Sequence, residues 1–159
     1  MLSIRQIAKF NLSYSSNLRK IGADMFDTKI AIVVRNDLLV WQKLNVTAFL
    51  TSGVLGADSG LLGEQYEDQT GNTYRPLIIQ PIIVLVADQA CLSKIHNRSL
   101  SRGVEAAIYI EDMFSTGHDA ANRAAVKKYD SDALNFVGLA IHDEKKLVDK
   151  ITKGAKMHP

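Results

Sequence analysis

The chain has 159 residues, a formal net charge of +2, a hydrophobic fraction of 47% and a charged fraction of 23%. These values fit one globular domain and exclude a disordered chain, a collagen-like chain and a strongly charged nucleic-acid-binding tail. The single cysteine, Cys91, excludes an intrachain disulfide and favours a reducing, cytoplasmic location. The longest apolar run covers residues 81–87, which is too short to span a bilayer, so we expect no membrane partner.

The first 24 residues differ in composition from the rest of the chain. They carry four basic side chains and no acidic one before Asp24, and they lack the apolar core of a secretory signal. We interpret residues 1–24 as an N-terminal extension, either an organelle transit segment or residues upstream of a start at Met25. Residues 25–159 are expected to form a single domain. Residues 29–159 hold 15 basic and 15 acidic side chains, so this body has no net charge to attract RNA, and a tRNA partner is disfavoured.

Hydrophobic patterning predicts the first elements in chain order. The β-branched run over 29–35 predicts a strand that is buried on both faces. The apolar residues of 40–57 predict a well-buried helix. Two short Tyr-containing segments within 64–75 flank a turn that contains Gly71 and Asn72, and this pattern predicts a β-hairpin insertion.

The second half of the chain alternates strands with helices. The predicted order is a strand over 77–87 that becomes regular at Pro81, a helix over 88–102, a strand over 104–110, a helix over 118–129, a strand over 134–141 and a helix over 143–153. Asp88 can cap the first of these helices, and Gly103 and Gly154 can end the first and the last. The alternation predicts a small α/β sandwich.

Polar residues follow the first predicted strand, where open α/β sheets bind their ligands. Arg35, Asp37 and Lys43 lie between this strand and its helix, and they could bind an anion or form a buried ion pair. The alternative is that Asp37 caps the start of the helix by accepting hydrogen bonds from loop amides.

A second polar cluster, Asp112, Thr116, His118 and Asp119, follows the strand over 104–110. A carboxylate beside a hydroxyl and an imidazole can orient water and transfer protons. The alternative is structural: Thr116 and Asp119 have the spacing of a capping box, which would leave His118 exposed.

Three other features have structural interpretations beside functional ones. Lys94, Arg98 and Arg102 form a basic stripe that could meet phosphates but is more typical of a solvated helix face. His96 is predicted to be a packing residue. Trp41 is predicted to lie in the core or in a dimer interface.

Several motifs that would identify a cofactor are absent. The chain has no G-x-x-x-x-G-K-[ST], G-x-G-x-x-G or G-x-S-x-G sequence. One cysteine and four scattered histidines lack the spacing of a metal site. We therefore expect neither a cofactor nor a metal.

Residues 29–38, with Lys43 shortly after, resemble the opening of the type II peptidyl-tRNA hydrolases. Residues 137–141 and 147–157 resemble the last strand and the ending of that family, and Asp112 and Thr116 keep its Asp-x-x-x-Thr spacing. The resemblance implies that Lys43, Asp112 and Thr116 correspond to the lysine, acid and hydroxyl of that family. Thr47 and Leu50 stand where the family has glutamine and histidine.

The chain also resembles an uncharacterised bacterial family, a domain of unknown function grouped with this fold. The segments that carry this likeness are residues 44–53, Glu64 with Tyr66, and residues 113–123. The likeness implies a three-layer α/β/α sandwich, with a mixed sheet of about four strands between helices, and a homodimer.

Two functions of different classes follow from these expectations. The first is a hydrolase of an ester or acyl bond in a small or nucleotide-linked substrate. In it Lys43 holds an anionic group, Asp112 assisted by His118 activates water, and Thr116 positions the water. The residues assigned to substrate contacts are Arg35, Asp37, Asn45, Asp119, Asn122 and Arg123. The alternative is a non-catalytic homodimeric module that binds a small ligand or a protein, which the replaced glutamine and histidine favour.

Overall fold

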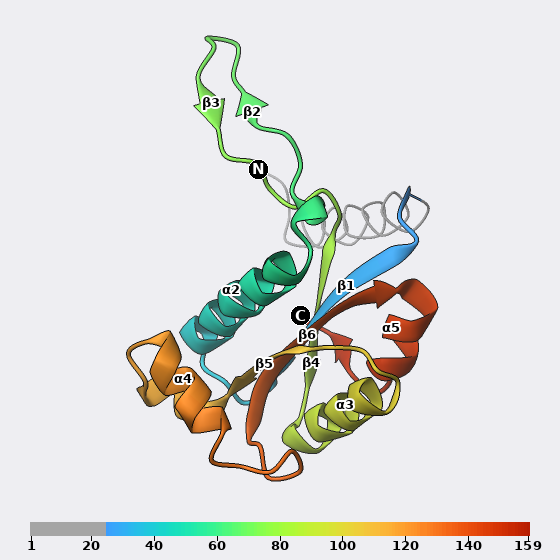
Figure 1. The fold of residues 1–159 in the computed structure, drawn as a ribbon. Coiled ribbons are helices and arrows are strands. Elements are labelled where there is room, and N and C mark those ends of the chain that lie inside the picture. The colour runs from blue at the N-terminus through green and yellow to red at the C-terminus, as the bar shows by residue number, and fades with distance from the viewer. Residues whose placement is uncertain (1–24) are drawn as a thin grey trace, which may run out of the picture.

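The computed structural model describes residues 25–159, which form a mixed α/β protein around one five-stranded sheet (Figure 1). The strand order is β5-β6-β1-β4-β7. Its members are β1 (Thr28–Arg35), β4 (Ile82–Ala87), β5 (Ala107–Ile110), β6 (Phe136–Glu144) and β7 (Lys156–Met157). Only β1 and β4 run parallel to each other, and every other neighbouring pair is antiparallel. The expectation of a mixed sheet is confirmed.

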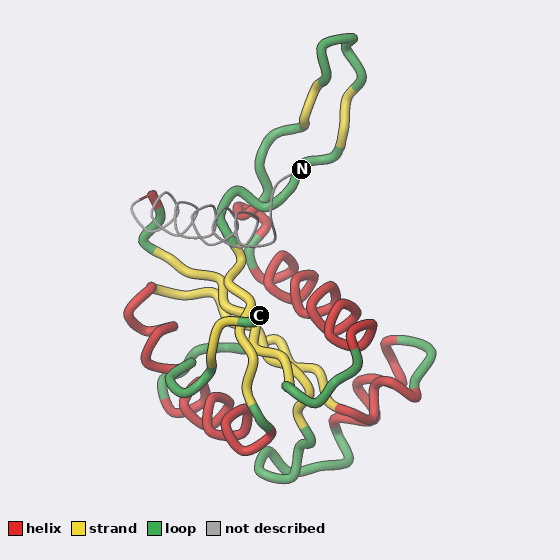
Figure 2. The backbone as a smooth tube through the Cα atoms, turned by 180° about the vertical axis from the view of Figure 1, so that it is seen from behind, coloured by secondary structure: helices red, strands yellow, loops and turns green. Residues whose placement is uncertain are grey.

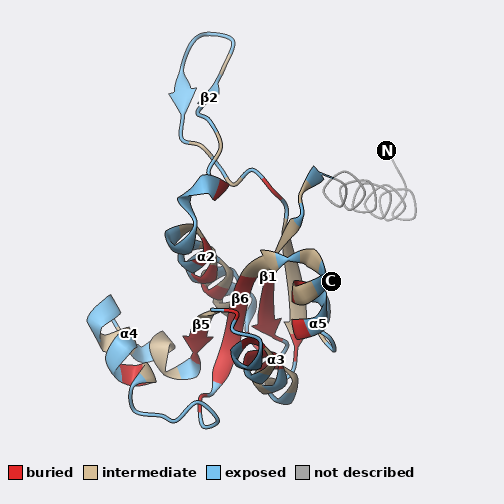
Figure 3. Ribbon diagram, turned by 45° about the vertical axis from the view of Figure 1, so that its right-hand side comes forward, coloured by how far each residue is buried: buried red, intermediate tan, exposed pale blue. Residues whose placement is uncertain are grey.

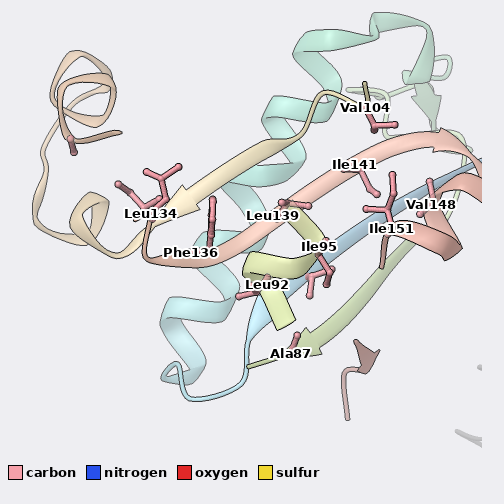
Figure 4. Packing of buried hydrophobic residues seen from close by; sticks show 14 residues of the cluster. Ala87, Leu92, Ile95, Val104, Leu134, Phe136, Leu139, Ile141, Val148 and Ile151 are labelled. Carbon is pink, nitrogen blue, oxygen red and sulfur yellow. The ribbon is translucent and has the colours of Figure 1, made fainter. Parts of the chain in front are cut away.

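Helices lie on both faces of this sheet. α2 (Val40–Ala57) covers one face, and α3 (Gln89–Ser101) and α5 (Lys145–Ile151) cover the other. The alternation of side chains along β1 explains this arrangement, because Ile32 and Val34 pack in the α2 cluster while Ala31 and Val33 pack in the opposite one. Figure 4 shows the second cluster between the sheet, α3 and α5. Because β1 is buried on both faces, its sequence is a continuous apolar run without alternation of polar residues.

The remaining helix, α4 (Asp119–Val126), follows the short helical segment η2 (Glu111–Ser115) and lies beyond the β5 edge of the sheet (Figures 1 and 2). Contacts between α4 and η2 hold the two segments together. Because η2 directly follows β5, it carries the polar cluster after this strand to the flank of the sheet.

The predicted hairpin insertion is confirmed as an arm that projects from the body (Figures 1 and 3). It consists of β2 (Tyr66–Glu67) and β3 (Thr73–Tyr74), and the segment η1 (Ser59–Leu61) connects α2 to it. Asp68 organises the tip, since its carboxylate accepts hydrogen bonds from Asn72, Thr70 and Tyr74. These bonds hold the pKa of the Asp68 carboxyl well below its ordinary value.

Two expectations about the fold are corrected. The sheet has five strands instead of about four, because Lys156 and Met157 at the end of the chain pair with Val86 and Leu85 of β4. α2 has the predicted bounds but is not well buried. Only its sheet-facing residues are enclosed, whereas its outer face is exposed (Figure 3). The members of this outer face are Val40, Trp41, Leu44 and Ala48.

The boundaries of four other elements differ from the predicted ones. The strand over 104–110 is regular only from Ala107, and the helix over 118–129 covers Asp119–Val126. The strand over 134–141 extends to Glu144, which shortens the last helix to Lys145–Ile151. β6 is long because it pairs with β1 along most of its length, from Thr28↔Glu144 to Val34↔Gly138.

Candidate functional site

Arg35, at the end of β1, is the centre of an ion-pair network. Its side chain is buried, and its Nε donates to Asp37 Oδ1 at 2.6 Å. Its Nη1 donates to Glu111 Oε2 at 2.8 Å and to Asn135 Oδ1 at 3.1 Å. Asn135 Nδ2 also donates to Glu111 at 2.8 Å. The predicted ion pair is therefore present with a buried guanidinium and exposed carboxylates, and Lys43 takes no part in it. The network ties the end of β1 to the segments before β6 and after β5.

The alternative role of Asp37 as a helix cap is wrong. α2 begins after Leu39. The amide of this N-cap residue donates to the side-chain oxygen of Gln42, Oε1, at 2.9 Å. Asp37 instead pairs with Arg35, because the turn between strand and helix carries its carboxylate back over the guanidinium.

Asp112 lies on η2, and Thr116 directly follows this segment as its C-cap. The Tyr129 hydroxyl donates to Asp112 Oδ2 at 3.0 Å, which fixes the carboxylate and raises the pKa of Tyr129. The Thr116 hydroxyl donates to the Met113 carbonyl at 2.8 Å and also contacts the side-chain oxygen of Asn122. The two predicted residues line one cleft.

The proposed capping box of Thr116 and Asp119 is wrong. His118 is the N-cap of α4, and its Nδ1 accepts a hydrogen bond from the Ala121 amide at 3.3 Å. Asp119 lies in the first turn of the helix and pairs with Arg123 one turn later. His118 is exposed, as that alternative expected, but it serves as the cap itself.

An open groove separates α2 from α4 above β5, and we call it the α2–α4 groove. It has a volume of about 600 Å³. Its apolar walls include Phe49, Leu50, Ile108, Tyr109, Met113 and Val126. Its polar side chains are Ser52 from α2, Asp119, Asn122 and Arg123 from α4, and Lys127, the C-cap of α4. Three residues predicted to contact a substrate, Asp119, Asn122 and Arg123, therefore share one groove.

Aromatic rings form the side of this groove next to α2. Tyr109 lies 5.7 Å from Phe49 and 5.3 Å from Phe114, measured between ring centroids. Trp41 extends the row, with its ring 5.8 Å from that of Phe114. Of this row, Phe49 and Tyr109 line the groove, and they give it an apolar side on which a planar ligand can pack.

The four predicted catalytic residues do not share a pocket. Asp112 and Thr116 line a polar cleft of about 520 Å³ on the other side of α4, together with Glu111, Ser115, Lys128 and Asn135. Lys43 lines a separate apolar pocket of about 400 Å³ with Val34, Val40, Leu44, Val84 and His158. His118 lines neither of these pockets, and the same holds for Asn45, which lies half-buried on α2.

Sequence reasoning missed the partners that complete these sites. Tyr129 holds Asp112 from 17 positions away, and Glu111 joins Arg35 across 76 positions. Tyr109 and Lys127 of the groove were also missed. Lys127 follows Arg123 by four residues, so helical spacing could have found it, whereas the contacts of Tyr129 and Glu111 depend on the tertiary fold.

The other singled-out residues have structural roles. Arg98 of the basic stripe donates to the carbonyls of Ile151 at 2.8 Å and Lys153 at 2.6 Å, so it secures the end of α5. His96 is buried and stacks on Phe136 with ring centroids 4.5 Å apart, which confirms it as a packing residue. Trp41 is 58% exposed, so its assignment to the core is wrong.

The described residues form neither a metal-binding cluster nor a membrane-spanning helix. Within residues 25–159, no group of three or more histidine, cysteine or acidic side chains is arranged to hold a metal ion. Over the same residues, none of the helices is long and apolar enough to cross a membrane.

The fold and the grooves define an α/β protein whose polar residues gather at one flank of a mixed sheet. Residues 28–159 match the model of a protein family of unknown function, DUF2000, and the chain belongs to this family. A solved structure of a protein of unknown function from Agrobacterium tumefaciens is similar, with 56% sequence identity and a TM-score of 0.83. The match covers 85% of this chain and all of that one. No functionally curated protein matches the chain.

Proposed function

We propose that this protein is a homodimeric module that binds a small molecule in the α2–α4 groove. The observation that carries the proposal is that Asp119, Asn122 and Arg123, which the sequence assigned to ligand contacts, line one apolar groove together with Phe49 and Tyr109. Apolar walls with a few convergent polar groups are typical of small-molecule sites. The separation of Lys43 from Asp112 favours binding over the four-residue catalytic site.

A ligand screen with groove-filling variants tests this proposal. Val126→Trp places a large ring inside the groove, and Ala120→Trp places the same ring on the exposed part of the same helix. Library compounds that bind the groove should raise the Tm of the wild-type protein and of Ala120→Trp, and leave that of Val126→Trp unchanged. A ligand that stabilises all three proteins equally would contradict the assignment to this groove.

The dimer rests on the outer face of α2. Val40, Trp41 and Leu44 are 76%, 58% and 67% exposed, and Lys43 is the only charged residue in all 18 residues of the helix. A contiguous exposed apolar patch marks an interaction surface, and a face without charge can meet its own copy about a two-fold axis without repulsion.

The oligomeric state in solution tests the dimer. Leu44→Glu should convert the dimer to a monomer in light scattering coupled to size exclusion, because it buries a carboxylate in an apolar interface. Lys94→Glu, on the opposite side of the sheet, is the matched control and should remain dimeric. A monomeric wild type, or a dimeric Leu44→Glu variant, would exclude this interface.

The second candidate is hydrolysis of an ester or acyl bond in the polar cleft. It is favoured by one observation, the closeness of Asp112 and Thr116 in a cleft with Lys128 and Glu111. In this reaction the Asp112 carboxylate takes a proton from water, and the oxygen of the water bonds to the acyl carbon. The bond between the acyl carbon and the ester oxygen then breaks, and the leaving alcohol receives the proton from Asp112. Tyr129 holds the carboxylate in position.

Ester hydrolysis by the purified protein tests this candidate. Asp112→Asn should abolish turnover of aryl acetates and aminoacyl esters, whereas Asp130→Asn, an exposed carboxylate on the next loop, should retain it. Lys43→Ala and His118→Ala extend the test to the other two predicted residues. The absence of activity in the wild-type protein, or full activity of Asp112→Asn, would contradict the proposal that the polar cleft hydrolyses esters.

The relation to the type II peptidyl-tRNA hydrolases is also a proposal. It is supported by helices on both faces of a mixed sheet and by the Asp112–Thr116 spacing. Superposition on solved hydrolases of that type tests it through the strand order β5-β6-β1-β4 and the position of Lys43.

The cytoplasmic location rests on the lone thiol of Cys91, and fractionation of cells that express the full chain tests it.

A further inference from the structure

Tyr109 on the floor of the α2–α4 groove carries a hydroxyl that no described residue satisfies. The residue is 6% exposed, and its ring is packed between Phe49 and Phe114. Its hydroxyl makes no hydrogen bond within residues 25–159, yet it is not among the side-chain atoms that are sealed from solvent. Water can therefore reach this hydroxyl, and a hydrogen-bond acceptor on a ligand in the groove can take the place of that water. Burial raises the pKa of Tyr109, so the group remains a proton donor at neutral pH.

The polar side of the groove carries one unbalanced positive charge. Asp119 pairs with Arg123, which leaves that pair neutral. Lys127, one turn further along α4, has no ion-pair partner among the described residues. One end of the Asn122 amide contacts Thr116, and the other end remains to meet a ligand. This combination suits a single anionic group of the size of a carboxylate.

The walls between these two polar positions are apolar. Ile108, Met113 and Val126 line the groove together with Phe49 and Tyr109, and its volume of about 600 Å³ is of the size that holds a small organic molecule. A polyphosphate does not fit this site, because Lys127 is its one unpaired cation and the groove has no glycine-rich loop.

We infer that the ligand of the α2–α4 groove is a small monoanion with a planar apolar body, whose acid group meets Lys127 and Asn122 and whose inner acceptor meets the Tyr109 hydroxyl. This inference rests on the proposed binding function and specifies its ligand. It requires that affinity depend on three separable features of the ligand: its apolar ring, its charge and its inner acceptor.

Calorimetric titration of the full chain with a matched set of probes tests the inference. The probes are naphthalene-2-carboxylate, its neutral amide and quinoline-6-carboxylate, in which a ring nitrogen replaces a CH group remote from the acid. The carboxylate should bind about tenfold more tightly than the amide, and the quinoline about tenfold more tightly than the naphthalene, as expected for one gained polar contact in each case.

Two variants assign each gain to its residue. Tyr109→Phe should remove the preference for the quinoline, so that the variant binds both carboxylates with the same affinity. Lys127→Gln should remove the preference for the carboxylate over the amide, and the control Lys94→Gln on α3 should retain it. Circular dichroism of each variant shows whether it is folded, and preference ratios measured within one variant are independent of its stability.

The outcomes distinguish this inference from the binding function itself. If the amide binds as tightly as the carboxylate, and Val126→Trp blocks both, the groove is a binding site and the monoanion is wrong. If Tyr109→Phe keeps the quinoline preference, the inner acceptor is wrong. If none of the probes binds and the library also yields no ligand that Val126→Trp blocks, both the inference and the proposed function fail.

Discussion

Arg35 is the one Lys, Arg, Asp or Glu side chain that is buried among the described residues, and its neutralisation depends on groups that lie far along the chain. Glu111→Ala should lower the free energy of unfolding by about 2 kcal/mol. This is less than the loss of a fully buried partner, because Glu111 is half-exposed and Asp37 remains. Urea denaturation measures the change. Glu105→Ala, an exposed carboxylate on the segment before β5, is the control, and an equal effect of both variants would contradict the role of the network.

His96 is expected to make the protein sensitive to acid. Burial lowers the pKa of His96, so the folded state keeps the imidazole neutral while the unfolded state takes up a proton below about pH 6.5. The unfolded state then binds more protons, and stability falls as the pH falls from about 7 to 5.

The variant His96→Leu should flatten this dependence, because leucine fills a similar volume beside Phe136 and does not titrate. Urea midpoints measured across the same pH range would reveal the difference in slope between the two proteins. Parallel curves for wild type and variant would show that the acid sensitivity arises at other groups.

At the scale of residues, sequence reasoning succeeds where the chemistry is local. The sequence put Asp112 and Thr116 in one cluster after the strand over 104–110, and the structure joins them in one cleft. The cap of α4 was assigned to the wrong residue because His118 and Thr116 can both serve, and the choice depends on where the backbone turns helical. The contact of Tyr129 with Asp112 requires the fold itself.

The packing of α2 on β6 depends on one small residue at the level of whole elements. A Cβ atom at Gly138 would lie 2.5 Å from Val46 Cγ1 and 2.9 Å from Leu50 Cδ1, inside the contact between helix and strand. Gly138→Ala should therefore destabilise the protein by about 2 kcal/mol, since the overpacked helix must shift from the sheet.

Gly56→Ala is the matched control for this substitution. Gly56 lies in the last turn of α2 with no atom within 4 Å of an added Cβ, so alanine there should be neutral or stabilise the helix by about 0.5 kcal/mol. Urea denaturation of both variants gives the comparison. Equal stability of the two would mean that α2 does not approach β6 as closely as the structure has it.

At the scale of elements, the predictable features are those with a long repeating pattern. The 18 residues of α2 were bounded correctly, and so were the hairpin and the Asp88 cap of α3, where the carboxylate accepts from the Cys91 amide at 2.7 Å. β7 was missed because two residues carry no periodicity and pair only through the approach of the chain end to β4. The exposed face of α2 was missed because apolar composition alone does not distinguish a core from an interface.

At the scale of the whole molecule, the sheet edge divides the polar residues between separate sites. η2 turns the segment after β5 so that Asp112 faces the polar cleft, while α4 presents Asn122 to the groove on its other side. The sequence placed all these residues within one short stretch, and proximity along the chain predicted one site. A helix has two sides, so residues a few positions apart on η2 and α4 serve different surfaces.

The distribution of charge over the whole chain predicts how the protein meets RNA. The four basic residues before Asp24 account for the positive net charge, since residues 29–159 are balanced at 15 basic and 15 acidic residues. Affinity of a protein for a phosphate backbone requires several unpaired cations, and it falls steeply with salt. The basic stripe of α3 also offers one cation fewer to a phosphate, because Arg98 is hydrogen-bonded to backbone carbonyls.

The protein of residues 25–159 should therefore form no complex with tRNA in a mobility-shift assay at about 0.15 M salt, where charges are screened beyond about 8 Å. The full chain should form at most a weak complex that disappears with added salt, because its excess cations all lie in the first 24 residues. Lys94→Gln and Arg102→Gln in the shorter protein would leave this result unchanged. A salt-resistant tRNA complex of residues 25–159 would instead require a specific phosphate-binding site within these residues. Such a complex would support tRNA as the substrate, as the resemblance to the peptidyl-tRNA hydrolases implies.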